Sequence, residues 1–105
     1  MVGQITPESL KERLDAGESL VILDVREPSE LALASLPGVV HIPMRQVPGR
    51  LDELDPDAPT VVMCHHGVRS MSVAQFLVER DFDRVENLTG GIDLWARQLG
   101  DVPRY

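Results

Sequence analysis

Apolar residues in this chain form short continuous runs, separated by longer stretches in which they recur every three or four positions. The runs at residues 20–24 and 60–63 have the length and the branched side chains of strands that are covered on both faces. Two less apolar runs, at residues 39–42 and 84–88, are bounded by proline, glycine or polar residues and are also predicted to be strands. These runs indicate a buried sheet.

The stretches between the runs have helix-start residues and helical spacing. Thr6 supplies an N-cap hydroxyl, Pro7 fits the first helical position and Glu8 places an acid in the first turn. Leu10 and Leu14 then form the expected buried stripe of this helix. We predict further helices at residues 28–33, 47–54, 70–80 and 92–99.

The alternation of strands and helices predicts an α/β fold. We expect a mainly parallel central sheet of about five short strands, with helices on both faces. The 105 residues contain no repeat or linker, so we expect one domain over residues 1–105. Ligands of such sheets bind outside the carboxyl ends of the strands, where both Asp24 and Cys64 are predicted to lie.

The only cysteine, Cys64, opens a loop between a predicted strand and a predicted helix. The first N–H groups of a helix have no internal partner and the helix dipole adds positive charge there, so an anion is stabilised. A thiol at such a place is shifted toward the reactive thiolate. Gly67 permits a backbone turn that aims several N–H groups at one centre. We therefore predict that Cys64 is a nucleophile, cradled by the substrate-binding residues His65, His66, Gly67, Val68, Arg69 and Ser70.

Composition limits which partners the protein can bind and which compartment it is expected to occupy. The net charge of −7 argues against nucleic acid as a partner, because binding phosphates requires clustered Lys and Arg. No stretch reaches the roughly 18 apolar residues of a membrane span, and no secretory signal is visible. A single cysteine suits a reducing compartment, so we expect a cytoplasmic monomer. The loop itself holds Arg69 and two histidines without an acid, which favours an anionic substrate.

The roles of four polar residues, the two loop histidines and Asp24 and Arg26, need separate consideration. Adjacent histidines are expected to diverge in direction, and no further ligand has usable spacing to Cys64. We therefore predict no metal site at His65 and His66, and no cofactor. They are expected to donate hydrogen bonds to an incoming anion or to face solvent. Asp24 and Arg26 are candidates for a supporting role: Arg26 and Glu30 would form an ion pair that fixes the turn between strand and helix, with direct catalysis as the alternative.

Three segments, in this order, resemble the signatures of a rhodanese domain. They are LDVREPSE at residues 23–30, CHHGVRS at residues 64–70 and GGIDLW at residues 90–95, and together they extend the resemblance over nearly the whole chain. One departure is Ser35, where the family often has histidine. The sequence around Cys64 is similar to that of rhodanese domains fused to sulfur-carrier-activating enzymes. These 105 residues include no adenylating domain, so we expect a stand-alone relative.

The resemblance implies a single-domain rhodanese-like sulfurtransferase. Cys64 would take a sulfane sulfur from a small anionic donor such as thiosulfate, carry it as a persulfide, and pass it to cyanide, a thiol or a protein sulfur carrier. The amides from His65 to Ser70 would hold the terminal sulfur, while Arg69 and the two histidines would steer the donor.

Two other function classes fit parts of the pattern. A cysteine phosphatase also places a thiolate among backbone amides, but it needs five residues between cysteine and arginine, whereas four separate Cys64 from Arg69. The smaller cradle suits a sulfur atom better than a phosphate. A non-enzymatic module that binds a protein, with Cys64 idle or acting as a redox sensor, is the second alternative.

Overall fold

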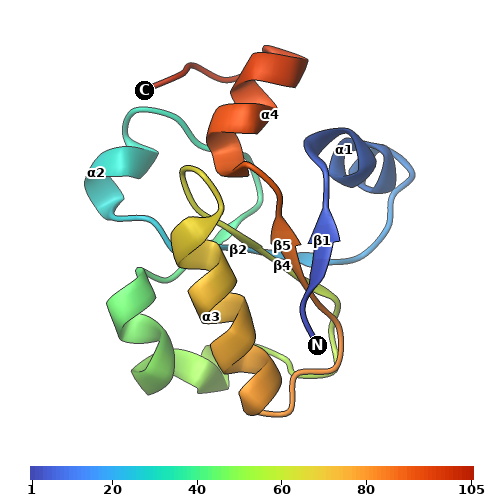
Figure 1. Cartoon of the computed structure of the whole chain (residues 1–105), viewed down its shortest axis with the longest axis vertical. Helices are drawn as coiled ribbons and strands as arrows, with labels where there is room; N and C mark the ends of the chain where they lie inside the picture. The colour runs from blue at the N-terminus through green and yellow to red at the C-terminus, as the bar shows by residue number, and fades with distance from the viewer.

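The structure is a computed structural model that describes all residues from 1 to 105, and its centre is a five-stranded parallel sheet. The strands are β1 (Gly3–Ile5), β2 (Val21–Asp24), β3 (Val40–His41), β4 (Thr60–Met63) and β5 (Val85–Leu88). Their order across the sheet is β1-β5-β4-β2-β3, and each neighbouring pair is parallel (Figure 1). The predicted α/β fold is confirmed.

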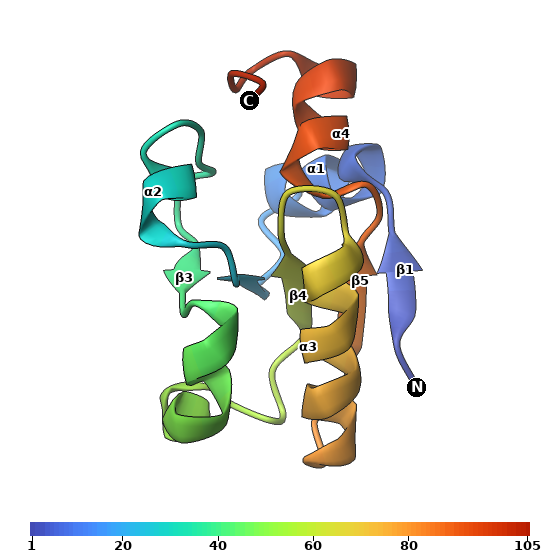
Figure 2. The ribbon, with the colours of Figure 1, turned by 60° about the vertical axis from the view of Figure 1, so that its left-hand side comes forward.

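Helices cover both faces of this sheet. They are α1 (Pro7–Asp15), α2 (Pro28–Leu31), the 3-10 helix η1 (Met44–Glu53), α3 (Val68–Glu79) and α4 (Gly91–Leu99). One face packs against α3 and η1, and the other packs against α1 and α4, which also contact each other. Figure 2 shows α4 above the loop that joins β4 to α3. None of the helices combines the length and the apolar character needed to span a bilayer.

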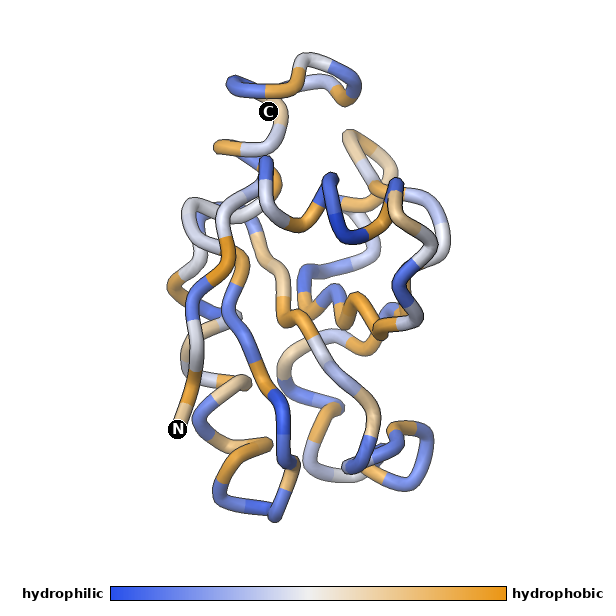
Figure 3. Tube along the Cα trace, turned by 90° about the vertical axis from the view of Figure 1, so that its right-hand side faces the viewer, coloured by the Kyte–Doolittle hydropathy of each residue, from blue (hydrophilic) through white to orange (hydrophobic).

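The pleat of β4 decides which face receives each side chain. Val61 and Met63 pack in the apolar cluster below α1 and α4, whereas Val62 packs in the cluster below α3. Cys64, one residue beyond the strand, continues this alternation and lies in the same cluster as Val62. The thiol is therefore on the α3 face. Figure 3 shows the apolar residues of the central strands between more polar outer segments.

Strand β1 was not among the predicted strands. Its sequence, Gly-Gln-Ile, contains no apolar run, and only Ile5 of the three residues is buried. Its pairing comes from the parallel register with β5, in which Ile5 lies beside Leu88. A strand this short at the edge depends on its neighbour rather than on its own pattern.

Two predicted helices differ from the structure in more than one or two residues at their ends. The segment at 47–54 begins earlier, at Met44, and is a 3-10 helix with Pro48 inside it. Because proline lacks an N–H and crowds the preceding turn, it disfavours a regular α-helix there. In α1, Leu10 is fully buried but Leu14 is 37% exposed, so the predicted stripe is only half correct.

Candidate active site

The Cys64 thiol lies inside a turn of backbone amides. Gly67, with φ of 98°, is the N-cap of α3 and turns the chain back over the sulfur. The Cys64 Sγ accepts hydrogen bonds from the Gly67 N–H at 3.1 Å and from the Ser70 N–H at 3.3 Å. Cys64 is only 1% exposed. Of the loop amides, those of Gly67 and Ser70 therefore point at this sulfur.

A series of hydrogen bonds through the Ser70 and Asn87 side chains connects this turn to β5. The Cys64 thiol donates to Ser70 Oγ at 3.2 Å, and the Ser70 hydroxyl donates to Asn87 Oδ1 at 2.5 Å. The Asn87 amide then donates to the Gly67 carbonyl oxygen at 3.1 Å. Asn87 was not among the predicted site residues, although an amide side chain buried in a strand is a signal of such a role.

The first turn of α4 holds the other side of the loop. The Ile92 N–H donates to the Cys64 carbonyl oxygen at 2.9 Å, and the Asp93 N–H donates to the His65 carbonyl oxygen at 3.0 Å. Gly91 has φ of +61°, and a Cβ there would lie 2.4 Å from each of these two oxygens. Gly91 is thus required by this close approach as well as by its positive φ.

Arg69 forms an ion pair with Glu30. Its two terminal nitrogens bind the two carboxylate oxygens of Glu30 at 2.7 and 2.8 Å, which links α3 to α2. The hydrogen bonds from Arg69 lower the pKa of Glu30 to about 2. The Tyr105 hydroxyl donates to the same carboxylate at 2.9 Å. The charge of Arg69 is therefore balanced within the protein.

Asp24 and Arg26 form a fully buried ion pair behind the site. Arg26 Nη2 lies 2.7 Å from Asp24 Oδ2, Arg26 Nε donates to Asp24 Oδ1 at 3.0 Å, and neither side chain has exposed area. The expected pairing of Arg26 with the Glu30 carboxylate is wrong, because Arg26 reaches only the Glu30 backbone oxygen, at 3.4 Å. The buried carboxylate of Asp24 requires a cation beside it. Both residues therefore support the turn.

The rings of the two loop histidines lie close together at a tilt of 37°, rather than diverging. The ring centroids of His65 and His66 lie 3.9 Å apart, and the His65 ring stacks on Tyr105 at 3.9 Å. The expectation that adjacent histidines diverge is therefore wrong here. His65 Nε2 is inaccessible to solvent and has no hydrogen-bond partner.

The two neighbouring histidines and Asp93 form a group of possible metal ligands. Ligand atoms of His65, His66 and Asp93 lie within 4.8 Å of one another, which the sequence spacing did not indicate. The Asp93 carboxylate, however, also binds Arg97 and Arg104, each at 3.3 Å. Two arginines already balance the negative charge that would attract a cation.

A pocket of about 280 Å³ opens beside the loop. It is lined by Val25, Glu27, Met44, Arg45 and Arg69. Val25 belongs to the apolar cluster that contains Cys64, and Met44 packs against that cluster. Arg69 is the one residue of the predicted loop that lines this pocket.

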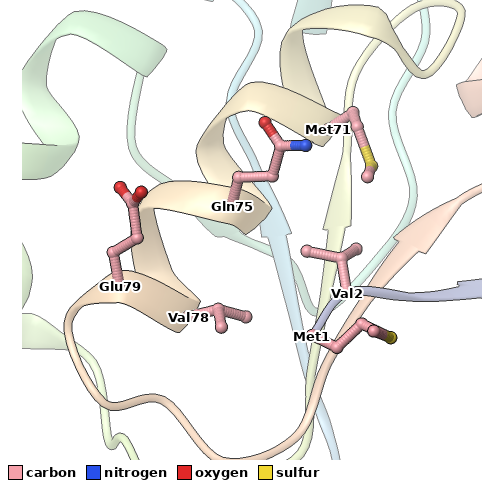
Figure 4. A pocket seen from close by; sticks show the side chains of 6 residues that line it. All are labelled: Met1, Val2, Met71, Gln75, Val78 and Glu79. Atoms are coloured by element: carbon pink, nitrogen blue, oxygen red, sulfur yellow. The ribbon is translucent and has the colours of Figure 1, made fainter.

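A second hollow lies between α3 and the residues before β1. Figure 4 shows its lining side chains, and its volume is about 410 Å³. The lining residues are Met1, Val2, Met71, Gln75, Val78 and Glu79. They include no cysteine, histidine or arginine, so the chemistry of the loop is not continued there.

Comparison with known proteins defines the family of this fold and loop. Residues 6–98 match the sequence model of the Rhodanese-like domain, so the chain belongs to the rhodanese-like domain family. It is 38% identical over 97 residues to a sulfurtransferase of Allochromatium vinosum, a match that covers 92% of this chain and 91% of that protein. It is 37% identical over 94 residues to the thiosulfate sulfurtransferase GlpE of Actinobacillus pleuropneumoniae, covering 90% of this chain and 86% of the relative.

Solved structures agree with the family. The crystal structure of a rhodanese-related protein from Thermoplasma volcanium superposes with a TM-score of 0.86 at 29% identity, and the match covers 98% of this chain and 99% of that one. The rhodanese-like fold indicated by the sequence resemblance is thereby confirmed.

Proposed function

We propose that this protein is a sulfurtransferase that carries sulfane sulfur as a persulfide on Cys64. Relatives named sulfurtransferases support a sulfurtransferase activity in general. The observation that carries the finer proposal is the pair of backbone amides, from Gly67 and Ser70, that donate to the Cys64 sulfur. Amides already aimed at a sulfur stabilise negative charge there without reorganisation.

The reaction consists of two displacements at sulfur. The Cys64 thiolate attacks the outer sulfur of a donor such as thiosulfate, the S–S bond of the donor breaks, and sulfite leaves with the electron pair. Cyanide or a thiol then attacks the terminal sulfur of the persulfide, and the electron pair returns to Cys64. Because each half-reaction is complete before the next begins, we expect ping-pong kinetics.

The loop residues have distinct proposed roles. The Gly67 and Ser70 amides donate to Cys64 Sγ, and in the proposed persulfide the amides from His65 to Ser70 would hold the terminal sulfur. The adjacent rings of His65 and His66 would steer the donor toward the loop. The Asp24–Arg26 pair acts on catalysis only through the shape of the turn, since both side chains are fully buried and bound to each other. A phosphatase is disfavoured because the Arg69 guanidinium is bound to Glu30.

Mass spectrometry of the intact protein after thiosulfate treatment tests this function. We expect the reduced protein to gain one sulfur atom, the gain to be reversed by dithiothreitol, and Cys64→Ser to gain none. The variant should remain folded, because serine retains the polar atom that accepts from Gly67 and Ser70. A folded wild-type protein that gains no sulfur from thiosulfate or from a second persulfide donor would contradict the proposal.

We place this reaction in a reducing compartment such as the cytoplasm, because Cys64 is a free thiol and must return to that state after each transfer. A protein sulfur carrier with an exposed thiol would serve as an acceptor by the same displacement.

A further inference from the structure

The chain after α4 returns to the Cys64 loop and places an aromatic ring against it. Figure 1 shows this segment running from the end of α4 toward α2. The Tyr105 ring stacks on the His65 ring, with 3.9 Å between the centroids and 7° between the planes. The His65 ring is also 3.9 Å from the His66 ring. His65 is therefore the middle ring of three.

Tyr105 is the ring of this group that hydrogen bonds hold in place. Its hydroxyl accepts from Arg26 Nη1 at 2.8 Å and donates to Glu30 Oε2 at 2.9 Å. Arg26 is itself fully buried in an ion pair with Asp24, and the Tyr105 side chain packs against the apolar cluster below α1 and α4. The phenol is thus anchored by groups that do not belong to the loop.

The two imidazoles lack such an anchor. His65 Nε2 is inaccessible to solvent and has no hydrogen-bond partner. The His66 side chain is 61% exposed, and its Nε2 lies 3.9 Å from Asp93 Oδ2, which is beyond hydrogen-bond distance. The orientation of both imidazoles therefore depends on contact with a neighbouring ring, and Tyr105 is the ring that anchors this contact.

We propose that Tyr105 is a positioning residue for the sulfur donor. Its ring holds His65, and His65 in turn holds the exposed imidazole of His66 at the rim of the loop, where it donates a hydrogen bond to an anionic donor. Tyr105 itself touches neither the donor nor the transferred sulfur. This inference rests on the proposed sulfurtransferase function and adds a residue, distant in sequence from the loop, that sets the affinity for the donor.

Loss of this positioning should weaken donor binding rather than slow the chemical step. The loop amides donate to the Cys64 sulfur, and Ile92 and Asp93 hold the carbonyl oxygens of Cys64 and His65. Removing the Tyr105 ring leaves all of these contacts in place. The expected change is therefore in the donor concentration at half-saturation, and not in the rate of persulfide formation at saturation.

The hydroxyl and the ring of Tyr105 can be removed separately. Tyr105→Phe removes the hydroxyl and keeps the ring, whereas Tyr105→Leu removes both. Because the buried Arg26 loses a hydrogen-bond partner in each case, both variants should be less stable than wild type in urea unfolding. Persulfide formation is then followed by mass spectrometry in single-turnover experiments over a range of thiosulfate concentrations.

We expect donor affinity to follow the ring and not the hydroxyl. Tyr105→Leu raises the half-saturating thiosulfate concentration on the order of fivefold and changes the saturating rate by less than about twofold. Tyr105→Phe changes both values by less than about twofold.

A double-mutant cycle shows whether Tyr105 acts through His66. His66→Ala should raise the half-saturating concentration as much as Tyr105→Leu does, and combining the two variants should produce no further increase. The matched control is Phe76→Leu, which removes a half-buried ring of α3 that contacts Arg80 rather than the loop histidines. This control should change neither value.

The outcomes separate this inference from the proposed function. The positioning role would be overturned, while the persulfide chemistry stands, by equal shifts for Tyr105→Leu and Tyr105→Phe, or by no shift for Tyr105→Leu. Multiplying effects of Tyr105→Leu and His66→Ala, or a fall in the saturating rate alone, would also overturn it. Wild-type protein that gains no sulfur at any thiosulfate concentration would overturn both.

Discussion

The backbone of Gly91 runs so close to the Cys64 loop that it has room for a hydrogen atom only. At the scale of single residues, this contact matters as much as the thiol itself, because it fixes the positions of the carbonyl oxygens of Cys64 and His65. With those oxygens turned toward α4, the opposite side of the loop presents its N–H groups to the sulfur. The glycine thereby determines which polar groups the thiol meets.

Substitution of Gly91 tests this role. We expect Gly91→Ala to lower the free energy of unfolding by about 3 kcal/mol and to slow persulfide formation, because both the positive φ and the contact with the loop become unfavourable. Gly100→Ala is the matched control: its φ is +70° but nothing lies within 4 Å of the added Cβ. It should lower stability by only about 1 kcal/mol and leave the transfer rate unchanged. Urea unfolding and single-turnover sulfur loading measure the two effects, and equal losses would contradict the contact argument.

At the scale of elements, α2 and α3 are joined by one carboxylate. Glu30 at the end of α2 accepts from Arg69 of α3, and Tyr105 binds the same group. The short helix α2 contains no buried residue of its own. Its position therefore depends strongly on this charged contact.

The contact makes stability sensitive to acid. The pKa of Glu30 is lowered to about 2 by Arg69, so the folded protein binds this proton less tightly than the unfolded chain does. The stabilisation is complete above the unfolded pKa of about 4.3 and is lost as the pH falls toward 2. Between pH 7 and pH 3, wild type should lose about 1 kcal/mol more than Glu30→Gln in urea unfolding. Glu79→Gln, at an exposed position of α3, should lose as much as wild type. Equal losses in wild type and Glu30→Gln would contradict this role.

The parts of the site that the sequence revealed are those encoded locally. The strand before Cys64, the glycine within the loop and the helix after it are neighbours in sequence, and their pattern predicted the cradle. Asn87 and Tyr105 were missed because their contacts with the loop join residues far apart in the chain. Likewise, β1 is a strand only because β5 lies beside it. Pairing partners of charged residues were also beyond local patterns, as the Arg69–Glu30 pair between α3 and α2 illustrates.

At the scale of the whole molecule, two apolar clusters share one sheet. Trp95 lies in the cluster below α1 and α4, and Cys64 lies in the cluster below α3. Alternate residues of β4 belong to the two clusters, so neither can be lost without disrupting the strand that supports the other. The protein should therefore unfold as one unit.

Two probes on opposite faces test this cooperativity. Trp95 is the only tryptophan and Cys64 the only cysteine, so fluorescence and thiol reactivity each report on one cluster. We expect the urea midpoint from Trp95 fluorescence to coincide with that from Cys64 labelling by an aromatic disulfide reagent, and with the loss of far-ultraviolet circular dichroism. Midpoints that differ beyond experimental error would show that one face opens before the other.

The hydrogen bonds from Ile92 and Asp93 to the carbonyl oxygens of Cys64 and His65 also have a consequence for protein engineering. A loop transplanted alone into another parallel-sheet scaffold would lose the groups that orient its peptide planes. The transferable unit is two separate pieces of chain, residues 64–70 and residues 90–93, and a graft that preserves the thiol environment must carry both.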